Sequence, residues 1–269
     1  ATLELLGEGW DTTVWLADGR WTFRFPRRKA TLPGIRNEIE LLPHLAERLP
    51  LPIPVPTLIG EPSKAFEWPF YGAPFLPGRE LADAGLDDAA RVALARPFGE
   101  FLRTLHALEL NADLPVDPVR RSDVSFRVPK GREFLARVVA EELWEPPPLA
   151  DEIFADGAAL PPAETGTVCH GDLHLRHLLV DGNRPSAVID WIDLSWNDPS
   201  VDVVLYWCAL PGEGRAAFLD AYGGLSDDQL LRARVLSLFL CSVLALYGHH
   251  ERFPRLRDEA VAGLERTCR

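Results

Sequence analysis

Short apolar runs separated by turn residues fill the first part of the chain. Residues 3–6, 14–16 and 21–25 are apolar or alternate between apolar and polar, and Asp18-Gly19, between the last two runs, is typical of a hairpin turn. From residue 36 to 48 apolar side chains recur every three or four positions, as they do on one face of a helix. The pattern predicts a β-rich segment that contains one helix.

Prolines mark the end of this segment. The prolines between residues 50 and 56 end the helix and favour an extended stretch, because proline lacks the backbone N–H that a helix needs. A further strand is predicted over residues 70–76, and Pro77-Gly78 stops it. We place a lobe boundary at this break, which gives an N-terminal lobe of residues 1–77 and a C-terminal lobe of residues 78–269.

The second lobe is predicted to be mainly helical. Asp87-Asp88 opens a helix in which Pro97 marks a kink or a join between two helices. Residues 111–132 look irregular and polar, residues 131–144 look helical, and the prolines at 146–148 stop that helix.

Several end signals support helices near the C-terminus. Ser226 and Gln229 form a capping box, and Gly248 suits the end of the same helix. Asp198-Pro199 combines an N-cap residue with a proline in the first turn. Residues 235–246 are the most apolar stretch but are too short to span a bilayer, so we predict a buried helix.

Composition and charge narrow the possible functions. A hydrophobic content of 47% and a charged content of 25% are ordinary for a globular protein. The formal net charge of −12 argues against a nucleic-acid partner; it favours a cationic small molecule, although solubility explains it equally well. The cysteines form no CxxC pair and the N-terminus lacks signal-peptide features, so we expect a cytoplasmic protein that does not cross a membrane.

The clearest chemical signal lies between residues 169 and 191. Asp172 and Asp190 flank a predicted hairpin. Phosphoryl-transfer enzymes use two such carboxylates: one orients or deprotonates the attacking hydroxyl, and the other holds the metal that bridges the nucleotide phosphates.

The run from His170 to His177 resembles the catalytic motif of the aminoglycoside phosphotransferase family, which has the form HGDxHxxN. Residues 6–15 resemble the nucleotide-binding loop of that family, residues 21–27 follow it, and residues 197–202 resemble its DPxxD element. The resemblance implies an α+β, protein-kinase-like two-lobed fold. A β-rich N-terminal lobe would bind the nucleotide, and a mainly helical C-terminal lobe would carry the catalytic hairpin and the substrate site.

The resemblance also assigns roles within the motif. It makes Asp172 the catalytic base and groups His170 with it, because His170 would pack and hydrogen-bond beneath the base. Asp190 is the expected Mg²⁺ ligand, since a carboxylate that closes a buried strand is costly unless it is paired or bound to metal. His177 stands where the family usually has asparagine. Some macrolide phosphotransferases are similar to this chain at that position. It could bind the metal, bond to phosphate or position Asp172.

A nucleotide site is expected in the N-terminal lobe. Arg24 stands where the family usually has a lysine that contacts the α- and β-phosphates, and Glu38 is its expected ion-pair partner. Glycines would let backbone N–H groups approach phosphate, threonines would add hydroxyl donors, and the end of the 70–76 strand would bond to the purine. The expected contacts with ATP or GTP are Gly7, Gly9, Thr12, Thr13, Arg24, Glu38, Phe75 and Leu76.

Three functions stay open at this point. The first is transfer of the γ-phosphoryl group of ATP or GTP to a hydroxyl of a small molecule, such as an aminoglycoside- or macrolide-like antibiotic or a metabolite. The second is a nucleotide-binding protein of the same fold without turnover, because Arg24 and His177 depart from the usual residues. The third is a metal-dependent hydrolase, since His174 and His177 have HxxH spacing in a segment rich in potential ligands.

The charge of the acceptor is the last expectation. Acidic residues cluster between positions 141 and 152 and could attract a polyamine-like acceptor. A solvated helix face explains the cluster equally well.

Overall fold

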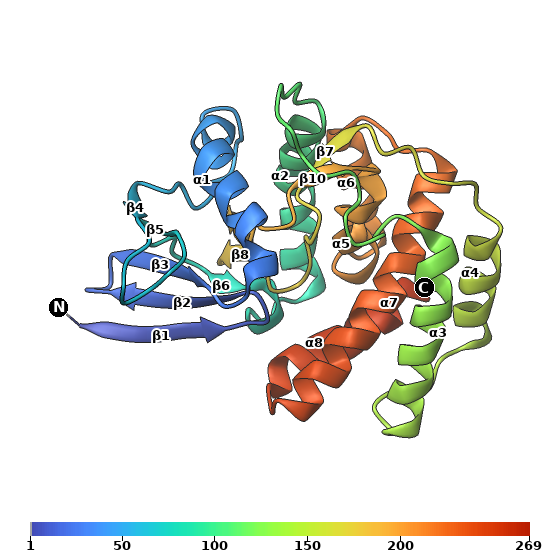
Figure 1. Ribbon diagram of the computed structural model, residues 1–269. Helices are drawn as coiled ribbons and strands as arrows, with labels where there is room; N and C mark the ends of the chain where they lie inside the picture. Colours follow the sequence, from blue (N-terminus) through green and yellow to red (C-terminus); the bar gives the residue numbers. More distant parts are fainter. Residues whose placement is uncertain (1) are drawn as a thin grey trace.

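The N-terminal lobe is an antiparallel sheet that packs against one helix (Figure 1). A computed structural model describes residues 2–269. The strand order is β1-β2-β3-β5-β4, and the β2–β3 hairpin turns at Asp18 and Gly19, which both have positive φ. Ile35 of the helix packs on Tyr71 and Ala73 of β5. The predicted strands are confirmed as β1 (Leu3–Glu8), β2 (Thr12–Ala17), β3 (Trp21–Pro26) and β5 (Phe70–Pro74), and the predicted helix as α1 (Leu32–Ala46). The strand β4 (Leu58–Gly60), after the proline-rich stretch, was not predicted.

The C-terminal lobe is mainly helical (Figure 1). Its longest helix, α7, packs against α3, α4, α5 and α8, while α2 packs against α6. The capping box at Ser226 and Gln229 is present at the start of α7, as predicted. The helices are α2 (Asp88–His106), α3 (Val124–Ala140), α4 (Pro148–Ala158), α5 (Val204–Cys208), α6 (Gly212–Tyr222), α7 (Asp227–His250) and α8 (Pro254–Thr267).

Two small sheets position the catalytic segment within this lobe. The predicted hairpin is present as β8 (Leu178–Asp181) and β9 (Arg184–Val188), and β6 (Arg79–Glu80) pairs with β8. A second pair joins β7 (Thr167–Cys169) to β10 (Ser195–Asn197). Because β6 follows the N-terminal sheet directly, this pairing brings the hairpin to the junction between the lobes. The division at residues 77 and 78 falls in the connection from β5 to β6 and stays a prediction.

The structure corrects the ends of the helix expected over residues 131–144. Helix α3 begins at Val124, because the Asp123 carboxylate caps it by accepting a hydrogen bond from the backbone N–H of Ser125. Part of the segment that looked irregular is therefore helical. Helix α3 ends at Ala140, so the prolines at 146–148 do not stop it. Pro148 instead opens the unpredicted helix α4, since the first turn of a helix tolerates proline.

Two other sequence interpretations change. Pro97 lies inside α2, which is a single helix rather than two. Gly248 does not end α7, which continues to His250; a Cβ at Gly248 would lie 2.6 Å from the backbone nitrogen of Arg257, so the glycine allows α8 to approach closely.

Helix α7 is long and apolar enough to cross a membrane by length and composition, with a mean hydropathy of 1.8 over its most apolar window. Our length argument against a span was therefore wrong, because the helix has 24 residues. Of that window, 67% is buried inside the protein, which confirms the prediction of a buried helix.

Candidate active site

The backbone of the loop between β7 and β8 is held in one conformation. Asp202, which is fully buried, accepts hydrogen bonds from the backbone N–H groups of His170 at 2.7 Å and Gly171 at 2.9 Å. Gly171 has a φ of 87°, in the left-handed region that favours glycine. A Cβ at this position would lie 2.2 Å from the carbonyl oxygen of Asp193. The loop therefore requires glycine for both conformation and space, and it aims the side chain of Asp172.

We expect Gly171→Ala to reduce both stability and phosphoryl transfer. Alanine at positive φ costs about 1–2 kcal/mol, and the contact with the Asp193 carbonyl must also be relieved by moving the loop. The matched control is Gly182→Ala in the β8–β9 turn, where φ is 58° and a Cβ would meet no atom within 4 Å. Urea unfolding and transfer rates should show a larger loss for Gly171→Ala. Equal losses in the two variants would contradict the role of close packing.

His170 has a structural place beneath the loop. Its ring is fully buried, accepts a hydrogen bond at Nδ1 from the backbone N–H of Asp172 (3.2 Å), and donates from Nε2 to the carbonyl oxygen of Ile189 (3.0 Å). It packs against Trp191, with ring centroids 4.7 Å apart. Burial lowers the pKa of His170 to about 4, despite the opposing effect of Asp202. A neutral ring with both nitrogens engaged orients the loop and has no free nitrogen for proton transfer.

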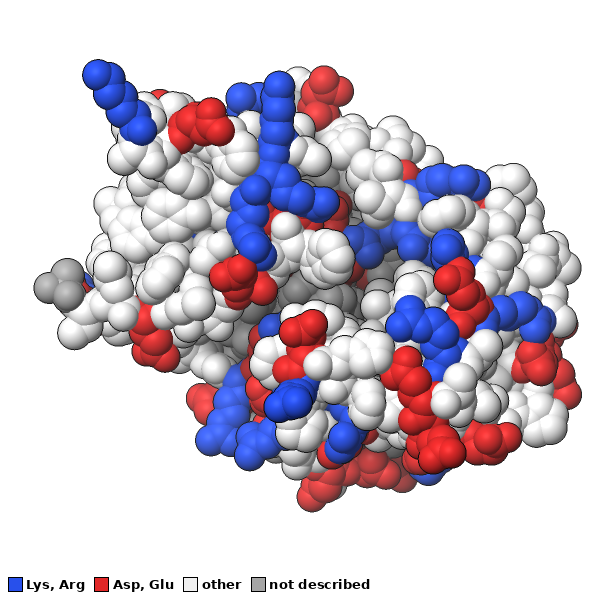
Figure 2. Space-filling view, turned by 60° about the horizontal axis from the view of Figure 1, so that its bottom comes forward, with Lys and Arg blue, Asp and Glu red and all other residues white. Residues whose placement is uncertain are grey.

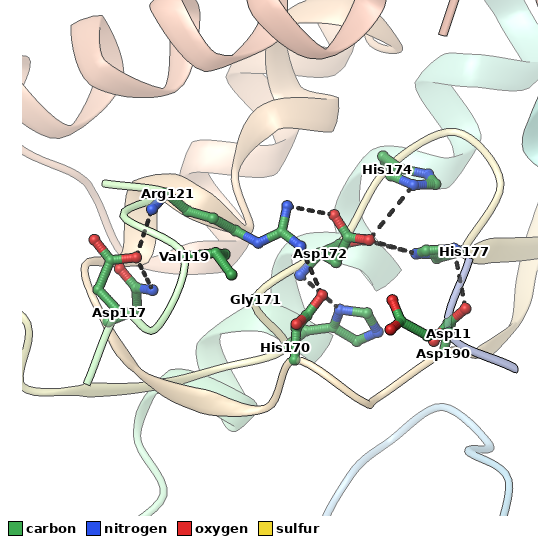
Figure 3. A network of polar contacts seen from close by, with 12 residues as sticks. Asp11, Asp117, Val119, Arg121, His170, Gly171, Asp172, His174, His177 and Asp190 are labelled. Atoms are coloured by element: carbon green, nitrogen blue, oxygen red, sulfur yellow. Dashed lines mark hydrogen bonds and ion pairs between the residues drawn. The ribbon is translucent and has the colours of Figure 1, made fainter. Parts of the chain in front are cut away.

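Asp172 projects from this loop into a ring of basic side chains (Figure 3). Its Oδ1 lies 2.7 Å from Nη1 of Arg121, and its Oδ2 lies 3.8 Å from Nε2 of His174 and 3.9 Å from Nδ1 of His177. Burial raises the pKa of Asp172 to about 6, because it outweighs the opposing charges of Arg121 and His177. The carboxylate is thus ionised at neutral pH and basic enough to accept a proton from a hydroxyl.

His177 links the two carboxylates that the sequence singled out. Its Nδ1 donates to the backbone carbonyl of Asp172 at 2.7 Å, and its Nε2 lies 3.5 Å from Oδ2 of Asp190 (Figure 3). Because a carbonyl oxygen can only accept, Nδ1 carries a hydrogen in this bond, and Nε2 is the ring nitrogen that faces Asp190. Asp172 and Asp190 therefore face a common space, one on each side of His177.

Asp190 ends an ion-pair chain that joins the two lobes. Arg24 of β3 pairs with Asp190, and its Nε lies 3.4 Å from Oε2 of Glu38 on α1. Glu38 is fully buried and accepts a hydrogen bond from the backbone N–H of Trp191 at 3.2 Å. The predicted pairing of Arg24 with Glu38 is present.

The charged groups of this ion-pair chain shift one another's pKa values. Burial alone would raise the pKa of Asp190, but Arg24 and His177 hold that pKa below its usual range. Burial raises the pKa of Glu38 to about 7 in spite of Arg24. Asp190 also has a φ of 66°, which non-glycine residues rarely adopt and which is typical of functional sites.

The predicted glycine turn leaves open space beside it. Gly7 lies at the end of β1, where a Cβ would meet no atom within 4 Å, and the N–H of Gly9 donates to the carbonyl of Thr12 at 2.9 Å. Thr12 is buried and Thr13 is half-buried, both on β2. Packing within the protein does not require these glycines, so the space beside Gly7 is free for a ligand.

Phe75 and Leu76 lie outside the strand expected over residues 70–76, since β5 ends at Pro74. The backbone N–H of Phe75 donates to the carbonyl of Arg20 at 2.8 Å. Phe75 thus uses this N–H to continue the pairing with β3, and it is not free to bond to a purine.

Sequence reasoning missed Arg121, which lies in the loop before α3. Its Nη2 lies 2.6 Å from Oδ2 of Asp193, so the guanidinium bridges Asp193 and Asp172. Asp117 anchors the loop by accepting hydrogen bonds from the backbone N–H of Arg121 and from the side chain of Asn197. No motif spacing relates Arg121 to the catalytic loop, so only the fold reveals the contact.

A tight zinc site does not fit the histidines. Asp172, His174 and His177 each offer a ligand atom within 4.8 Å of the others. However, Nδ1 of His174 accepts a hydrogen bond from the backbone N–H of Arg176 at 3.2 Å, so the ring hydrogen lies on Nε2, which faces Asp172. Nδ1 of His177, which lies 3.9 Å from Oδ2 of Asp172, also carries a hydrogen, because it donates to the Asp172 carbonyl. Neither histidine therefore offers a free nitrogen toward Asp172, as a zinc site of a hydrolase would need.

The surface of the protein is hollowed between the lobes (Figure 2). Figure 2 shows a hollow near the middle of one face, between the N-terminal lobe on the left and the C-terminal lobe on the right, with basic and acidic side chains around it. A β-rich lobe, a helical lobe and two carboxylates facing a common space define a protein-kinase-like phosphotransferase.

The chain belongs to the phosphotransferase enzyme family (APH), whose model matches residues 2–235. Among solved structures, the GDP and kanamycin complex of APH(2")-IIIa has a TM-score of 0.71 and 25% sequence identity, covering 99% of this chain and 92% of that chain. The apoenzyme of macrolide 2'-phosphotransferase MphH from Brachybacterium faecium has a TM-score of 0.59 and 26% identity, covering 98% and 92%. The predicted family, α+β fold and small-molecule kinase class are confirmed.

A curated relative matches over a short segment. The uncharacterised protein YcbJ of Bacillus subtilis is 37% identical over 57 residues, which are 21% of this chain and 19% of that protein. The match therefore spans about a fifth of the relative's length.

Proposed function

We propose that the protein transfers the γ-phosphoryl group of ATP or GTP to a hydroxyl of a small molecule. The observation that carries this proposal is the convergence of Asp172 and Asp190 on either side of His177, next to the Arg24–Glu38 pair. This reaction needs a base and a metal-binding carboxylate close to each other. The GDP-bound state of the APH(2")-IIIa structure supports the nucleotide part of the proposal.

The chemical step requires little covalent work from the protein. The acceptor oxygen forms a bond to the γ-phosphorus, and the bond from that phosphorus to the β–γ bridging oxygen breaks. The nucleoside diphosphate leaves with the electron pair of that bond, and the hydroxyl proton passes to Oδ2 of Asp172. Oδ2 suits this role because Oδ1 is paired with Arg121. His170 and Asp202 orient the loop without exchanging protons.

We propose that Asp190 holds Mg²⁺ with help from Nε2 of His177. The donor set fits the ion because a carboxylate oxygen of Asp190 and Nε2 of His177, the ring nitrogen that the Asp172 carbonyl does not use, face each other at 3.5 Å. Imidazole is a softer donor than magnesium prefers, so Asp190 is the main protein ligand. When bound, the ion neutralises charge on the phosphates and orients them.

The nucleotide contacts follow from the N-terminal lobe. Arg24 is cationic under all ordinary conditions, because Asp190 and Glu38 raise its pKa although burial opposes this, and its planar fork suits phosphate oxygens. The backbone around Gly7 and Gly9, with the hydroxyls of Thr12 and Thr13, borders the open space over the phosphates. Backbone groups of Phe75 and Leu76 other than the engaged Phe75 N–H would hold the purine.

The acceptor is a small hydroxylated molecule in this proposal. Two of the five acids between residues 141 and 152, which suggested a cationic acceptor, have local partners: Glu141 contacts His250, and Asp151 pairs with Arg132. They give no support to a cationic acceptor at Asp172. We place the activity in the cytoplasm, since all four cysteines are free thiols, as a reducing compartment maintains.

A transfer screen tests the function. The protein is incubated with Mg-ATP or Mg-GTP and with kanamycin, gentamicin, a macrolide and hydroxylated metabolites, and each acceptor is examined by mass spectrometry for the addition of one phosphoryl group. Product formation on any acceptor supports the proposal. Stabilisation by nucleotide without any product would favour the alternative of a binding protein without turnover, which the departures at Arg24 and His177 suggested. Absence of nucleotide binding would contradict both.

We expect Asp190→Asn to weaken binding of Mg-nucleotide about 10- to 100-fold, the effect of losing one charge-assisted contact of roughly 1.5–3 kcal/mol. Titration calorimetry with magnesium and with EDTA measures this change. Binding to the wild type should depend strongly on magnesium, and binding to the variant should depend on it weakly. An unchanged magnesium dependence in the variant would contradict the assignment of Asp190.

A further inference from the structure

A small pocket lies against Asp172 on the side of the C-terminal lobe. Arg121 and Arg127 line one part of it, and the apolar side chains of Val201, Leu236 and Phe239 line another. The backbone at Gly171 and the Asp172 side chain close the pocket toward the catalytic loop. A ligand in this space would touch the proposed base directly.

The pocket is on the acceptor side of the base. In Figure 3, Arg121 approaches Asp172 from one side, whereas His177 and Asp190 lie on the other. Since Asp190, His177 and Arg24 form the proposed nucleotide and metal side, an acceptor whose hydroxyl meets Oδ2 of Asp172 would extend the rest of its skeleton toward Arg121.

The two arginines differ in how their charges are balanced. Arg121 is paired with Asp172 and Asp193. Arg127 donates only to backbone carbonyls, of Arg120 at 2.9 Å and of Val119 at 2.6 Å, and has no carboxylate within 4.0 Å among residues 2–269.

The remaining contacts of Arg127 do not neutralise it. Its guanidinium lies over the rings of Phe126 and Phe239, at 5.3 and 5.0 Å from their centroids, which is a weaker interaction than an ion pair. Burial and the nearby Arg121 lower the pKa of Arg127 to about 10, although the carboxylates of Asp117, Asp172 and Asp123 oppose this, so Arg127 stays cationic at neutral pH. A partly desolvated cation with no carboxylate in direct contact favours an anion in the space beside it.

Arg121 adds an unused donor to the same wall. Its Nε is buried and has no hydrogen-bond partner within the described part of the chain. The two guanidiniums together offer more N–H donors than the protein's own acceptors use. An amine in the same position would instead meet the like charge of Arg127.

We propose that the acceptor carries an oxyanion, a carboxylate or a phosphate, which Arg127 binds while the hydroxyl to be phosphorylated reaches Asp172. This inference rests on the proposed function and specifies its substrate class. Val201, Leu236 and Phe239 form the apolar wall beside this anion site, so a hydroxy acid with an apolar part fits better than a polycation. Arg127 is the residue that determines this specificity.

The experiment offers each carbon skeleton in three forms. Glucuronate, glucose and 6-amino-6-deoxyglucose form one set, and mandelate, phenylethylene glycol and 2-amino-1-phenylethanol form another, each supplied with Mg-ATP and Mg-GTP. Transfer is measured for the wild type, Arg127→Gln, Arg127→Lys and Arg132→Gln. Arg132 lies on the same helix, is exposed and pairs with Asp151, so its variant is the matched control. Melting temperatures and nucleotide affinities establish that each variant is folded.

Within each set of three acceptors, the wild type should phosphorylate the acid with the highest kcat/KM. Arg127→Gln should raise the KM for that acid at least about tenfold, as expected for losing one charge-assisted contact, with a smaller effect on kcat. Arg127→Lys should restore part of the loss, and Arg132→Gln should behave as the wild type.

Several outcomes would overturn the inference. These are better transfer to the neutral or amine member, a KM for the acid that Arg127→Gln does not change, and absence of transfer to every acid. Failure of the proposed phosphotransferase function would give a different result. In that case the protein would bind no nucleotide and would phosphorylate none of the acids, neutral compounds or amines. Transfer to amines that is insensitive to Arg127 would keep the phosphotransferase and remove only the anionic acceptor.

Discussion

Replacing Asp172 with asparagine should reduce phosphoryl transfer by about 10²- to 10⁴-fold, the contribution typical of a positioned general base. Asparagine has nearly the same shape, so the loop held by Asp202 should stay in place. It cannot accept a proton from the acceptor hydroxyl, which is the one chemical task assigned to Asp172. Nucleotide affinity should stay nearly unchanged, because Arg24 and Asp190 lie on the other side of His177.

The effect of the variant on stability should be small. Arg121 loses one of its two carboxylate partners but keeps Asp193, so its charge is not left unpaired. Asp181→Asn is the matched control, because Asp181 is an exposed carboxylate at the end of β8 in the same hairpin. Transfer rates, nucleotide affinity and melting temperature are measured for both variants. Transfer by Asp172→Asn at the wild-type rate would show that another group accepts the proton.

The parts of the site that sequence predicted are local or belong to recognisable motifs. Asp172 lies in a short loop whose glycine and histidine have fixed spacing, and Asp190 follows an apolar strand. Both positions are dictated by the backbone of one hairpin, which leaves few alternatives. The pairing of Arg24 with Glu38 was harder to predict, since the two residues come from different elements. The resemblance supplied their pairing, and the packing of α1 beside the sheet brings them to 3.4 Å.

Arg121 and Arg127 could not be found in this way. Arg121 lies 72 residues before its partner Asp193, and it comes from a loop that carries no periodic pattern. Its contact with the base depends on how α3 and that loop pack over the catalytic hairpin, which is a property of the tertiary structure. The charge balance of the acceptor pocket therefore became visible only in the fold, and it points away from the cationic acceptor that net charge suggested.

The errors in helix ends have a similar origin. The Asp123 cap of α3 and the proline that opens α4 are both present in the sequence, but polar and proline-rich segments also occur in loops. What makes these segments helical is burial, since α3 and α4 pack against each other and against α7. Local signals alone could not decide between helix and loop there.

Asp202→Asn should give the largest loss of stability in this site, about 3 kcal/mol or more, because buried donors that lose their acceptor cost roughly 1–3 kcal/mol each. The carboxylate accepts from the backbone N–H groups of His170 and Gly171 and lies 3.1 Å from Nε2 of His106. An amide offers one oxygen where two are needed, and its NH₂ group would face another donor. The loop should loosen, so transfer should fall as well.

The pH dependence of the unfolding free energy distinguishes the contribution of the Asp202 charge from the contribution of its shape. Burial alone would raise the pKa of Asp202, but the hydrogen bond and charge of His106, with the N–H groups of the loop, lower it below its usual value. A depressed pKa adds stability that is fully present above the unfolded pKa of about 4 and is lost as pH falls through the folded pKa. The difference in unfolding free energy between the wild type and Asp202→Asn should therefore be largest near neutral pH and shrink below about pH 4.

Urea unfolding at pH 7, 5 and 3.5 measures this difference for Asp202→Asn and for the control Asp220→Asn. Asp220 is 69% exposed and pairs with Arg96 at the surface, where such a pair contributes about 0–1 kcal/mol. A gap between the wild type and Asp202→Asn that stays constant with pH would mean that shape rather than charge holds the loop. A gap no larger than that of Asp220→Asn would mean that the loop keeps its conformation without this carboxylate. In that case, Gly171 and its contact with Asp193 would have to account for the position of Asp172 by themselves.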